Sequence, residues 1–322
     1  MVGKLTPDDI VTASTVPAIM GFSPYQTPNE KLHDAIQSAA GNPPKRIPQN
    51  QPMFWGDTLE PVILAETAKR LGLVYVKTDI DTPFFHSVLP FACSLDGEGS
   101  GGSKVFTHDP ANGIYVPQGG RVDTSSIGVL EAKNASCRAE EPQPSPHRGV
   151  WQIQAQMEIT QRSWGCLAVL YQGNDLRLYL YRRDEDMVDE ITDAVHEFER
   201  RKRDIDWYPV YTSEDGNVAW DRVDDAAPPI DLNNIEDGEF YAEMLVQAKA
   251  DKKAAEQQID IAEAGLKEIL GNHEEGSVTV DGASYYIKWP MRRVRAQPAK
   301  TVPAKPESVM RQKTLTVKAV VS

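Results

Sequence analysis

The sequence predicts an α/β protein, with a layered core in which helices cover a mixed sheet, followed by a C-terminal helical arm. Several segments repeat apolar residues with helical spacing, and the short alternating or apolar runs between them are typical of strands. The arm is predicted by a separate pattern. Between 245 and 269, mostly apolar residues recur at alternating intervals of three and four.

The elements of the core follow in order along the chain. Gly21 and Pro24 separate the first two predicted helices, and Gly72 ends the third. A Gly-rich insertion at 97–127 is expected to be an exposed excursion from a sheet edge. The patterns predict helices at 7–20, 27–39, 55–72, 148–160 and 184–204, and strands at 73–77, 88–95, 128–133, 166–171 and 176–181.

Three regions are predicted from shifts in composition. Residues 1–211 carry the core pattern, and 212–235 read as a polar, acidic linker containing two adjacent prolines. Residues 236–322 contain the helical arm at 240–270, a short hairpin at 277–289 and a basic tail.

The tail contrasts in charge with the rest of the chain. The whole chain has a formal charge of −13, yet from Trp289 to Ser322 there are eight Lys or Arg residues, including Arg292 and Arg293, against the single acid Glu307. Such a tail suits contact with nucleic-acid phosphates, and Arg292 and Arg293 are candidate DNA-binding residues. Charge alone fits a solvated tail equally well.

Composition excludes several classes of protein. The chain has 322 residues, of which 40% are hydrophobic and 25% charged, as in globular proteins. No run of about 18 apolar residues is present, and the N-terminus lacks a signal-peptide pattern, so we expect a cytoplasmic protein without a membrane anchor. Cys93, Cys137 and Cys166 are isolated, which argues against a disulfide framework and a cysteine metal site.

The residues that could carry out chemistry lie at the end of one predicted strand and within another. Asp96 comes at one strand end, and Glu131-Ala132-Lys133 lies in the strand after the insertion. Alternation along a strand places Glu131 and Lys133 on one face, so Asp96 and Glu131 can converge on a divalent cation. Lys133 could then position or deprotonate the attacking water and offset phosphate charge. An Asp followed by this short pattern is weak evidence by itself.

Two further residues strengthen the pattern. Glu60 lies between apolar helical positions and directly before Pro61, where a merely solvated glutamate is unexpected. Gln152 lies on the next predicted helix after the Glu131 strand, and Gln156 shares its face of that helix. Glu60, Asp96, Glu131, Lys133 and Gln152 together would form the catalytic site of a metallonuclease.

These residues occur in six blocks that resemble the lambda exonuclease and YqaJ-type viral recombinase family of the PD-(D/E)XK nuclease superfamily. The order of the blocks is that of the family, and they extend over roughly residues 8–205. The blocks are Val11-Thr-Ala-Ser14, Gly21-Phe-Ser-Pro-Tyr25, Trp55-Gly-Asp-Thr-Leu-Glu-Pro61, Ala92-Cys-Ser-Leu-Asp-Gly97, Leu130-Glu-Ala-Lys133 and Trp151-Gln-Ile-Gln-Ala-Gln-Met157.

The resemblance implies a restriction-endonuclease-like core and a 5′-to-3′ exonuclease acting on double-stranded DNA ends. It implies that Asp96 and Glu131 bind Mg²⁺, or Mn²⁺ in its place, with Glu60 as an accessory carboxylate. Lys133 would be the catalytic lysine and Gln152 a helper near the attacking water.

The resemblance also implies partners. They are a single-strand annealing protein of a bacteriophage recombination system and further copies of the chain in a ring, most simply a trimer. Ser14 would match a serine that contacts the terminal 5′ phosphate. The arginine expected shortly before Ser14 is absent, since Pro7 and Asp8 stand there, and the insertion before Glu131 is longer than usual.

Other classes of function remain open. A structure- or sequence-directed endonuclease of the same superfamily would share the active site, and a non-catalytic DNA-binding or assembly protein could use the same fold. The stretch Gly97–Lys104 superficially resembles a phosphate-binding loop but has Lys and Ser in the wrong order. No nucleotide, haem or iron–sulfur cofactor is therefore expected.

Overall fold

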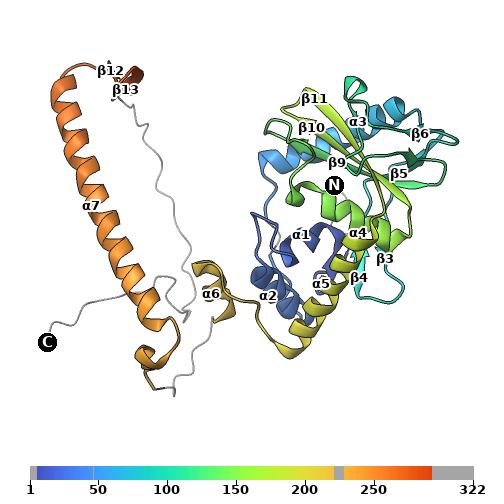
Figure 1. Ribbon diagram of the computed structural model, residues 1–322, viewed down its shortest axis with the longest axis horizontal. Helices are drawn as coiled ribbons and strands as arrows, with labels where there is room; N and C mark the ends of the chain where they lie inside the picture. The colour runs from blue at the N-terminus through green and yellow to red at the C-terminus, as the bar shows by residue number, and fades with distance from the viewer. Residues whose placement is uncertain (1–5, 46, 221–227, 292–322) are drawn as a thin grey trace, which may run out of the picture. The chain divides into compact units, whose positions relative to one another are not determined.

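The computed structural model describes residues 6–45, 47–220 and 228–291. It divides into two compact units, 1–221 and 222–322, each of which is described by itself (Figure 1). The first unit has the predicted α/β architecture, with mixed sheets flanked by helices. None of the helices in these ranges has the length and apolar character needed to cross a membrane.

A six-stranded mixed sheet forms the centre of the first unit, in the order β2-β5-β9-β10-β11-β7. Parallel pairs join β9 to β10 and β11 to β7, whereas the remaining neighbours are antiparallel. The antiparallel pair of β10 and β11 contains the strands predicted at 166–171 and 176–181. The strands are β2 (Tyr75–Lys77), β5 (Gly97–Ser100), β7 (Ile114–Tyr115), β9 (Gly128–Ala135), β10 (Trp164–Tyr171) and β11 (Asp175–Arg182).

Helices cover both faces of this sheet, as Figure 1 shows. On one face α3 (Gln51–Leu71) buries Ile63 and Leu64 in a cluster that also contains Leu130 of β9. On the other face α4 (Val150–Thr160) buries Ile153 in a cluster that contains Val129, with α5 (Glu185–Asp204) packed behind it. Successive residues of β9 therefore face α3 and α4 alternately, as the sequence predicted.

The prediction of one helix over 7–20 is wrong. The segment contains β1 (Val11–Thr12), a 3₁₀ turn (Ala13–Thr15) and the single-turn α1 (Val16–Ile19). β1 pairs in parallel with β4 (Phe91–Cys93), which pairs in turn with β3 (Phe84–Phe85). The Thr15 hydroxyl also donates to the Thr12 carbonyl at 2.9 Å, so side-chain hydrogen bonds favour a turn here.

The second helix is confirmed as α2 (Pro28–Ala39). Its N-terminus has Thr27 and Glu30 in a reciprocal capping box.

The insertion at 97–127 is less exposed than predicted. Its first residues form β5, which lies inside the central sheet between β2 and β9. Glu98 is buried there because it accepts hydrogen bonds from the Tyr75 hydroxyl and from Arg162, both at 2.8 Å. The rest of the insertion includes β7 at the sheet edge and a small ribbon of β6 (Val105–Phe106) with β8 (Val122–Asp123).

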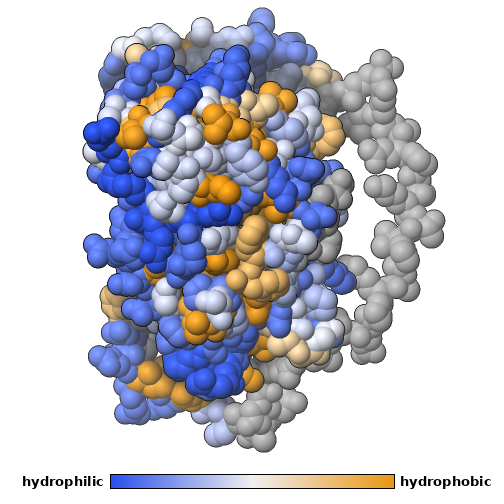
Figure 2. All heavy atoms as spheres, turned by 90° about the vertical axis from the view of Figure 1, so that its right-hand side faces the viewer, coloured by the Kyte–Doolittle hydropathy of each residue, from blue (hydrophilic) through white to orange (hydrophobic). Residues whose placement is uncertain are grey.

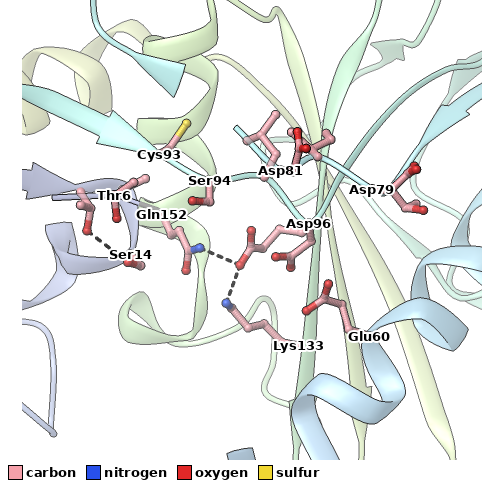
Figure 3. A pocket seen from close by; sticks show the side chains of 16 residues that line it. Thr6, Ser14, Glu60, Asp79, Asp81, Cys93, Ser94, Asp96, Lys133 and Gln152 are labelled. Atoms are coloured by element: carbon pink, nitrogen blue, oxygen red, sulfur yellow. Dashed lines mark hydrogen bonds and ion pairs between the residues drawn. The ribbon is translucent and has the colours of Figure 1, made fainter. Parts of the chain in front are cut away.

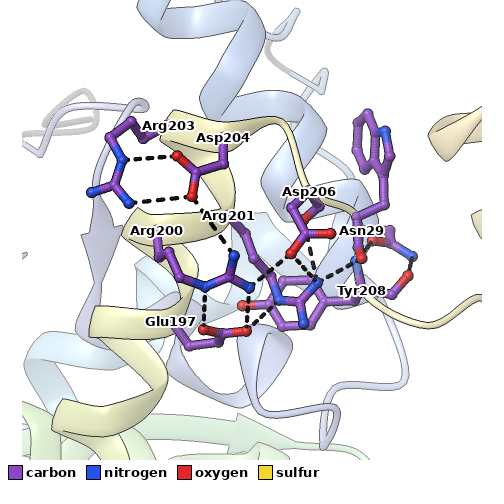
Figure 4. Close-up of polar contacts among 9 residues, drawn as sticks. Asn29, Glu197, Arg200, Arg201, Arg203, Asp204, Asp206 and Tyr208 are labelled. Atoms are coloured by element: carbon purple, nitrogen blue, oxygen red, sulfur yellow. Dashed lines mark hydrogen bonds and ion pairs between the residues drawn. The ribbon is translucent and has the colours of Figure 1, made fainter.

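A network of charges fixes the chain where α5 ends. Arg200 and Arg201 each pair with both Glu197 and Asp206 (Figure 4). Asn29 of α2 receives the Tyr208 backbone N–H at 2.8 Å and donates to the Tyr208 carbonyl at 3.1 Å. These contacts hold residues 206–208 between α5 and α2.

The segment predicted as a linker begins with ordered structure. α6 (Ser213–Ala219) packs on α2, and its Asp215 is 1% exposed. The Thr27 hydroxyl and the backbone N–H of Tyr211 both donate to Asp215, so hydrogen bonds compensate for burial of this carboxylate. The acidic, polar composition of the segment concealed this one anchoring residue.

The second unit contains the predicted arm and hairpin. α7 (Gly238–Leu270) is one continuous helix, and β12 (Glu275–Val280) and β13 (Ala283–Lys288) form an antiparallel pair. The face of the first unit that Figure 2 turns toward the viewer carries hydrophobic side chains in small patches separated by hydrophilic ones.

Candidate active site

Asp96 and Glu131 are brought together by pairing between neighbouring strands. Asp96 directly precedes β5, and Gly97 pairs with Leu130 of β9, one residue before Glu131. The Asp96 carboxylate accepts the backbone N–H of Ala132 at 2.9 Å, which holds it against β9. The two carboxylates predicted to converge therefore lie beside each other.

Glu131 is 1% exposed, yet three side chains donate hydrogen bonds to it. Lys133 Nζ and Gln152 Nε2 reach its Oε1 at 2.5 and 2.6 Å, and Gln156 Nε2 reaches its Oε2 at 2.7 Å. Gln152 and Gln156 are one helical turn apart on the same face of α4. Both oxygens of Glu131 are thus oriented by β9 and α4.

The start of α4 depends on Gly149, which has a φ of 117°. A Cβ atom at this position would stand 2.8 Å from the Leu167 side chain and 3.5 Å from Lys133. Glycine therefore allows α4 to begin close to β10 and to present Gln152 to the site.

Glu60 approaches from α3. Figure 3 shows its carboxylate directed toward Asp96, with Lys133 and Gln152 entering the same space. Burial, followed by the charges of Glu131 and Asp57, raises the pKa of Glu60. A cavity of about 660 Å³ is lined by all five predicted catalytic residues, Glu60, Asp96, Glu131, Lys133 and Gln152.

The charges in this cavity are unbalanced. Burial and the neighbouring Glu131 raise the pKa of Asp96 well above its ordinary value. Burial opposes the charge on Lys133, but Glu131, Asp96 and Glu60 together raise its pKa, so the lysine is a cation. Among the described residues, five acidic side chains and one ammonium group line the cavity, so a further cation there would favour the ionised forms of these acids.

The donor chemistry fits a hard divalent cation. Such ions take carboxylate oxygens and complete their coordination with water and substrate phosphate. Within residues 6–45, 47–220 and 228–291, no three His, Cys, Asp or Glu side chains are already arranged as a metal-binding group. Glu131 instead accepts hydrogen bonds from Lys133 and the two glutamines. Asp96 and Glu131 are the residues that would hold the cation, with Glu60 as the accessory carboxylate.

Ser14 lies across the cavity from Glu60 (Figure 3). It is exposed in the 3₁₀ turn after β1, and its hydroxyl is 3.2 Å from the Thr12 hydroxyl. Thr6 also lines this side. The structure therefore places the predicted phosphate-contacting serine in the same cavity as the carboxylates. Arg292 and Arg293, the other predicted DNA-binding residues, lie outside the described residues.

Residues 7–163 match the family model of the YqaJ-like viral recombinase domain. Residues 7–163 are thus similar to that domain over just under half of the chain. The resemblance inferred from the six sequence blocks is thereby confirmed. The match supports a nuclease role on DNA, and the YqaJ-like domain contains all five predicted catalytic residues together with Ser14.

Solved structures similar to this chain include two exonucleases. LHK-Exo, an alkaline exonuclease from Laribacter hongkongensis, is 19% identical with a TM-score of 0.44, over 62% of this chain and 90% of its own. A phage-related exonuclease from Haemophilus somnus 129PT is 10% identical with a TM-score of 0.39, over 61% of this chain and 94% of its own. No curated protein sequence matches the chain.

Gln156 is a residue of the YqaJ-like domain whose role the sequence did not indicate. It is fully buried, and besides Glu131 it donates to the Ser94 carbonyl at 3.2 Å. The helical pattern placed it on one face with Gln152 but could not show that this face meets Glu131. A glutamine one turn after a candidate catalytic glutamine was the available signal.

We expect Gln156→Leu to lower the cleavage rate or the affinity for the divalent cation by about 10- to 100-fold, because partners that orient metal ligands have effects of this size. Gln154→Leu is the matched control. Gln154 is equally buried on α4, but it bonds the Arg182 carbonyl and the Asp184 N–H, away from the site. Cation titrations of activity, with thermal unfolding of each variant, check this. Equal losses in the two variants would contradict it.

Proposed function

We propose that the chain is a metal-dependent 5′-to-3′ exonuclease that digests linear double-stranded DNA from its ends and exposes 3′ single strands. The observation that carries the proposal is the convergence of Asp96, Glu131, Lys133, Gln152 and Glu60 in one cavity within a YqaJ-like domain. Mg²⁺ is the proposed cation, with Mn²⁺ as a substitute.

Each side chain has a proposed task in phosphodiester hydrolysis. Asp96 and Glu131 would hold a divalent cation, which when bound would supply Lewis-acid polarisation of the phosphate and a more acidic water. Lys133, a cation with a raised pKa, offsets the charge that develops on the phosphate. Gln152, which is 2.6 Å from Glu131, orients that carboxylate and the attacking water. Ser14 receives the terminal 5′ phosphate on the opposite side of the cavity.

The proposed products and partners follow from the polarity of digestion. Removal of one strand from its 5′ end leaves a 3′ single strand, which is the substrate of a single-strand annealing protein in phage recombination. We also propose that the nuclease core forms a ring of identical copies, most simply a trimer, through which the duplex passes. Arg292 and Arg293 would contact DNA phosphates.

The test compares linear duplex DNA with covalently closed circles of the same sequence. We expect Mg²⁺-dependent release of mononucleotides from linear DNA and no cleavage of the circles, because digestion requires an end. Labels at the 5′ and 3′ termini give the direction, and release of the 5′ label first is the expected result. Cutting of intact circles would indicate an endonuclease and would overturn the proposal.

A further inference from the structure

α7 is a long helix with little cover from its own unit. Its 33 residues extend about 50 Å at 1.5 Å per residue. Within the described residues, Leu270 is its one buried side chain, whereas Ile259, Leu266 and Ile269 are exposed. Isolated helices derive little stability from propensity alone, so a helix that exposes these residues needs a surface to pack against.

Ile259, Leu266 and Ile269 belong to a stripe with coiled-coil spacing, which we call the seam, whereas the exposed Val246 and Ile261 lie outside it. Its members alternate by three and four residues, the period of two helices that wind around each other. Lys252 is the one charged residue among them. The seam consists of Leu245, Ala248, Lys252, Ala255, Ile259, Ala262, Leu266 and Ile269.

We propose that α7 pairs with α7 of a second copy in antiparallel orientation. The seam of one helix then packs against the seam of the other, which runs in the opposite direction. In each layer of the pair, the two facing residues lie equally far before and after position 257. Ala248 lies opposite Leu266, Ala255 opposite Ile259, and Leu245 opposite Ile269. A small residue meets a large one in the first two of these layers, which fills space better than equal residues would.

Lys252 decides against a parallel pair. In a parallel pair Lys252 of one helix would face Lys252 of the other across the seam, where two ammonium groups would be partly desolvated. Each alanine of the seam would also face the same alanine of the other helix, which fills the space between the helices poorly. In the antiparallel pair Lys252 lies opposite Ala262, so its stem packs on a methyl group and its ammonium reaches water.

Charges beside the seam favour the same orientation. Antiparallel pairing places Lys249 beside Glu263 of the second copy, and by symmetry the pair occurs twice. Parallel pairing instead places Asp251 beside Glu256, which is a repulsive contact, also twice. One like-charge pair, Glu256 with Glu256, is close to the antiparallel axis, where Lys252 of the same chain lies 3.8 Å from Glu256 and reduces the repulsion.

The pairing is two-fold symmetric and therefore closed. The pairing therefore requires an even number of chains in the assembly. The assembly is a dimer if α7 is the sole contact, or a hexamer of two rings if the nuclease core is trimeric. In both cases the mass is an even multiple of the chain. This inference concerns assembly alone and holds whether or not the proposed exonuclease reaction is correct.

The first test is the mass of the full chain by light scattering, with a matched pair of variants. Ile259→Asp places a charge in the seam. Ile261→Asp places the same charge on the opposite side of α7, at a residue that is 72% exposed compared with 58% for Ile259. We expect an even-numbered wild-type assembly, half that mass for Ile259→Asp, and the wild-type mass for Ile261→Asp. A wild-type monomer or trimer, or equal behaviour of the two variants, would overturn the proposal.

The second test is orientation, by cross-linking with a short bis-maleimide in a Cys137→Ser background that retains the buried Cys93 and Cys166. Gln258→Cys lies beside the antiparallel two-fold axis and is expected to link to itself. Ala248→Cys is expected not to link, because the two copies of this residue are roughly 27 Å apart along the axis. Self-linking of Ala248→Cys would indicate a parallel pair. Absence of links from both would mean that α7 packs on another surface.

Discussion

Glu131→Gln and Asp96→Asn are each expected to reduce nuclease activity about 10³-fold or more. Both substitutions keep the shape of the side chain but remove an anionic oxygen that would hold the divalent cation, and Lewis-acid stabilisation of this kind is worth several kcal/mol, or about tenfold per 1.4 kcal/mol. In Glu131→Gln the new amide group also meets donors from Lys133, Gln152 and Gln156. Its loss of activity should therefore equal or exceed that of Asp96→Asn.

The fold should survive Asp96→Asn. Burial and Glu131 raise the pKa of Asp96, so the folded state holds this proton more tightly than the unfolded chain does. Ionisation of Asp96 consequently lowers stability as the pH rises from its ordinary pKa toward neutrality. Asp96→Asn removes that cost, and at neutral pH in the presence of a chelator the variant should unfold at the wild-type temperature or above it.

The measurements are initial rates on linear DNA across a range of Mg²⁺ concentrations and thermal unfolding with chelator. Asp189→Asn is the control, because Asp189 is an exposed carboxylate on α5 that does not line the cavity. Near-wild-type turnover by either active-site variant, under conditions where Asp189→Asn is also active, would show that the site is assigned to the wrong residues.

The parts of the site that alternate along one strand could be predicted from the sequence. Strand geometry places Glu131 and Lys133 on one face and Ala132 on the other, and the packing of Ala132 toward α3 agrees. The contact of Asp96 with Ala132 is different, because it depends on pairing between segments 36 residues apart. The order of the predicted strands could suggest that Asp96 lies near Ala132. The contact itself is determined by the register between β5 and β9, which the sequence does not give.

The failures of prediction have the same origin. Val11 and Thr12 have neighbours that permit a helix, but their pairing with Phe91 and Ala92 of β4 outweighs this local preference. In the insertion, the glycines at 97 and 99 led to the prediction of an exposed loop, where the structure has a buried strand. A Cβ at Gly99 would stand 2.7 Å from the Leu73 side chain and 3.0 Å from the Tyr75 carbonyl oxygen, so glycine is favoured there by close packing that the sequence does not display.

Lys133→Met is the second substitution for which we expect a large effect, a loss of about 10²- to 10³-fold in cleavage rate with binding of the divalent cation largely retained. Methionine preserves much of the length and apolar volume of the lysine stem, so the change isolates the ammonium group. That group is 2.5 Å from Glu131 Oε1, and the surrounding carboxylates raise its pKa despite its burial. A positive charge next to the reacting phosphate is worth a few kcal/mol in the transition state.

Stability provides a second, independent readout of the same variant. Without a bound cation, Lys133 is the ammonium group that faces Glu60, Asp96 and Glu131, so Lys133→Met should lower the unfolding temperature in chelator. A divalent cation bound by Asp96 and Glu131 would replace the lost charge, and adding Mg²⁺ should therefore raise the unfolding temperature of the variant more than that of the wild type. No increase in either protein would mean that the carboxylates do not bind the cation, and equal increases would mean that the bound cation does not take over the charge of Lys133. The expected result is a larger increase in unfolding temperature for Lys133→Met than for the wild type, together with lost activity. This result would show that the lysine acts in catalysis in addition to neutralising buried charge.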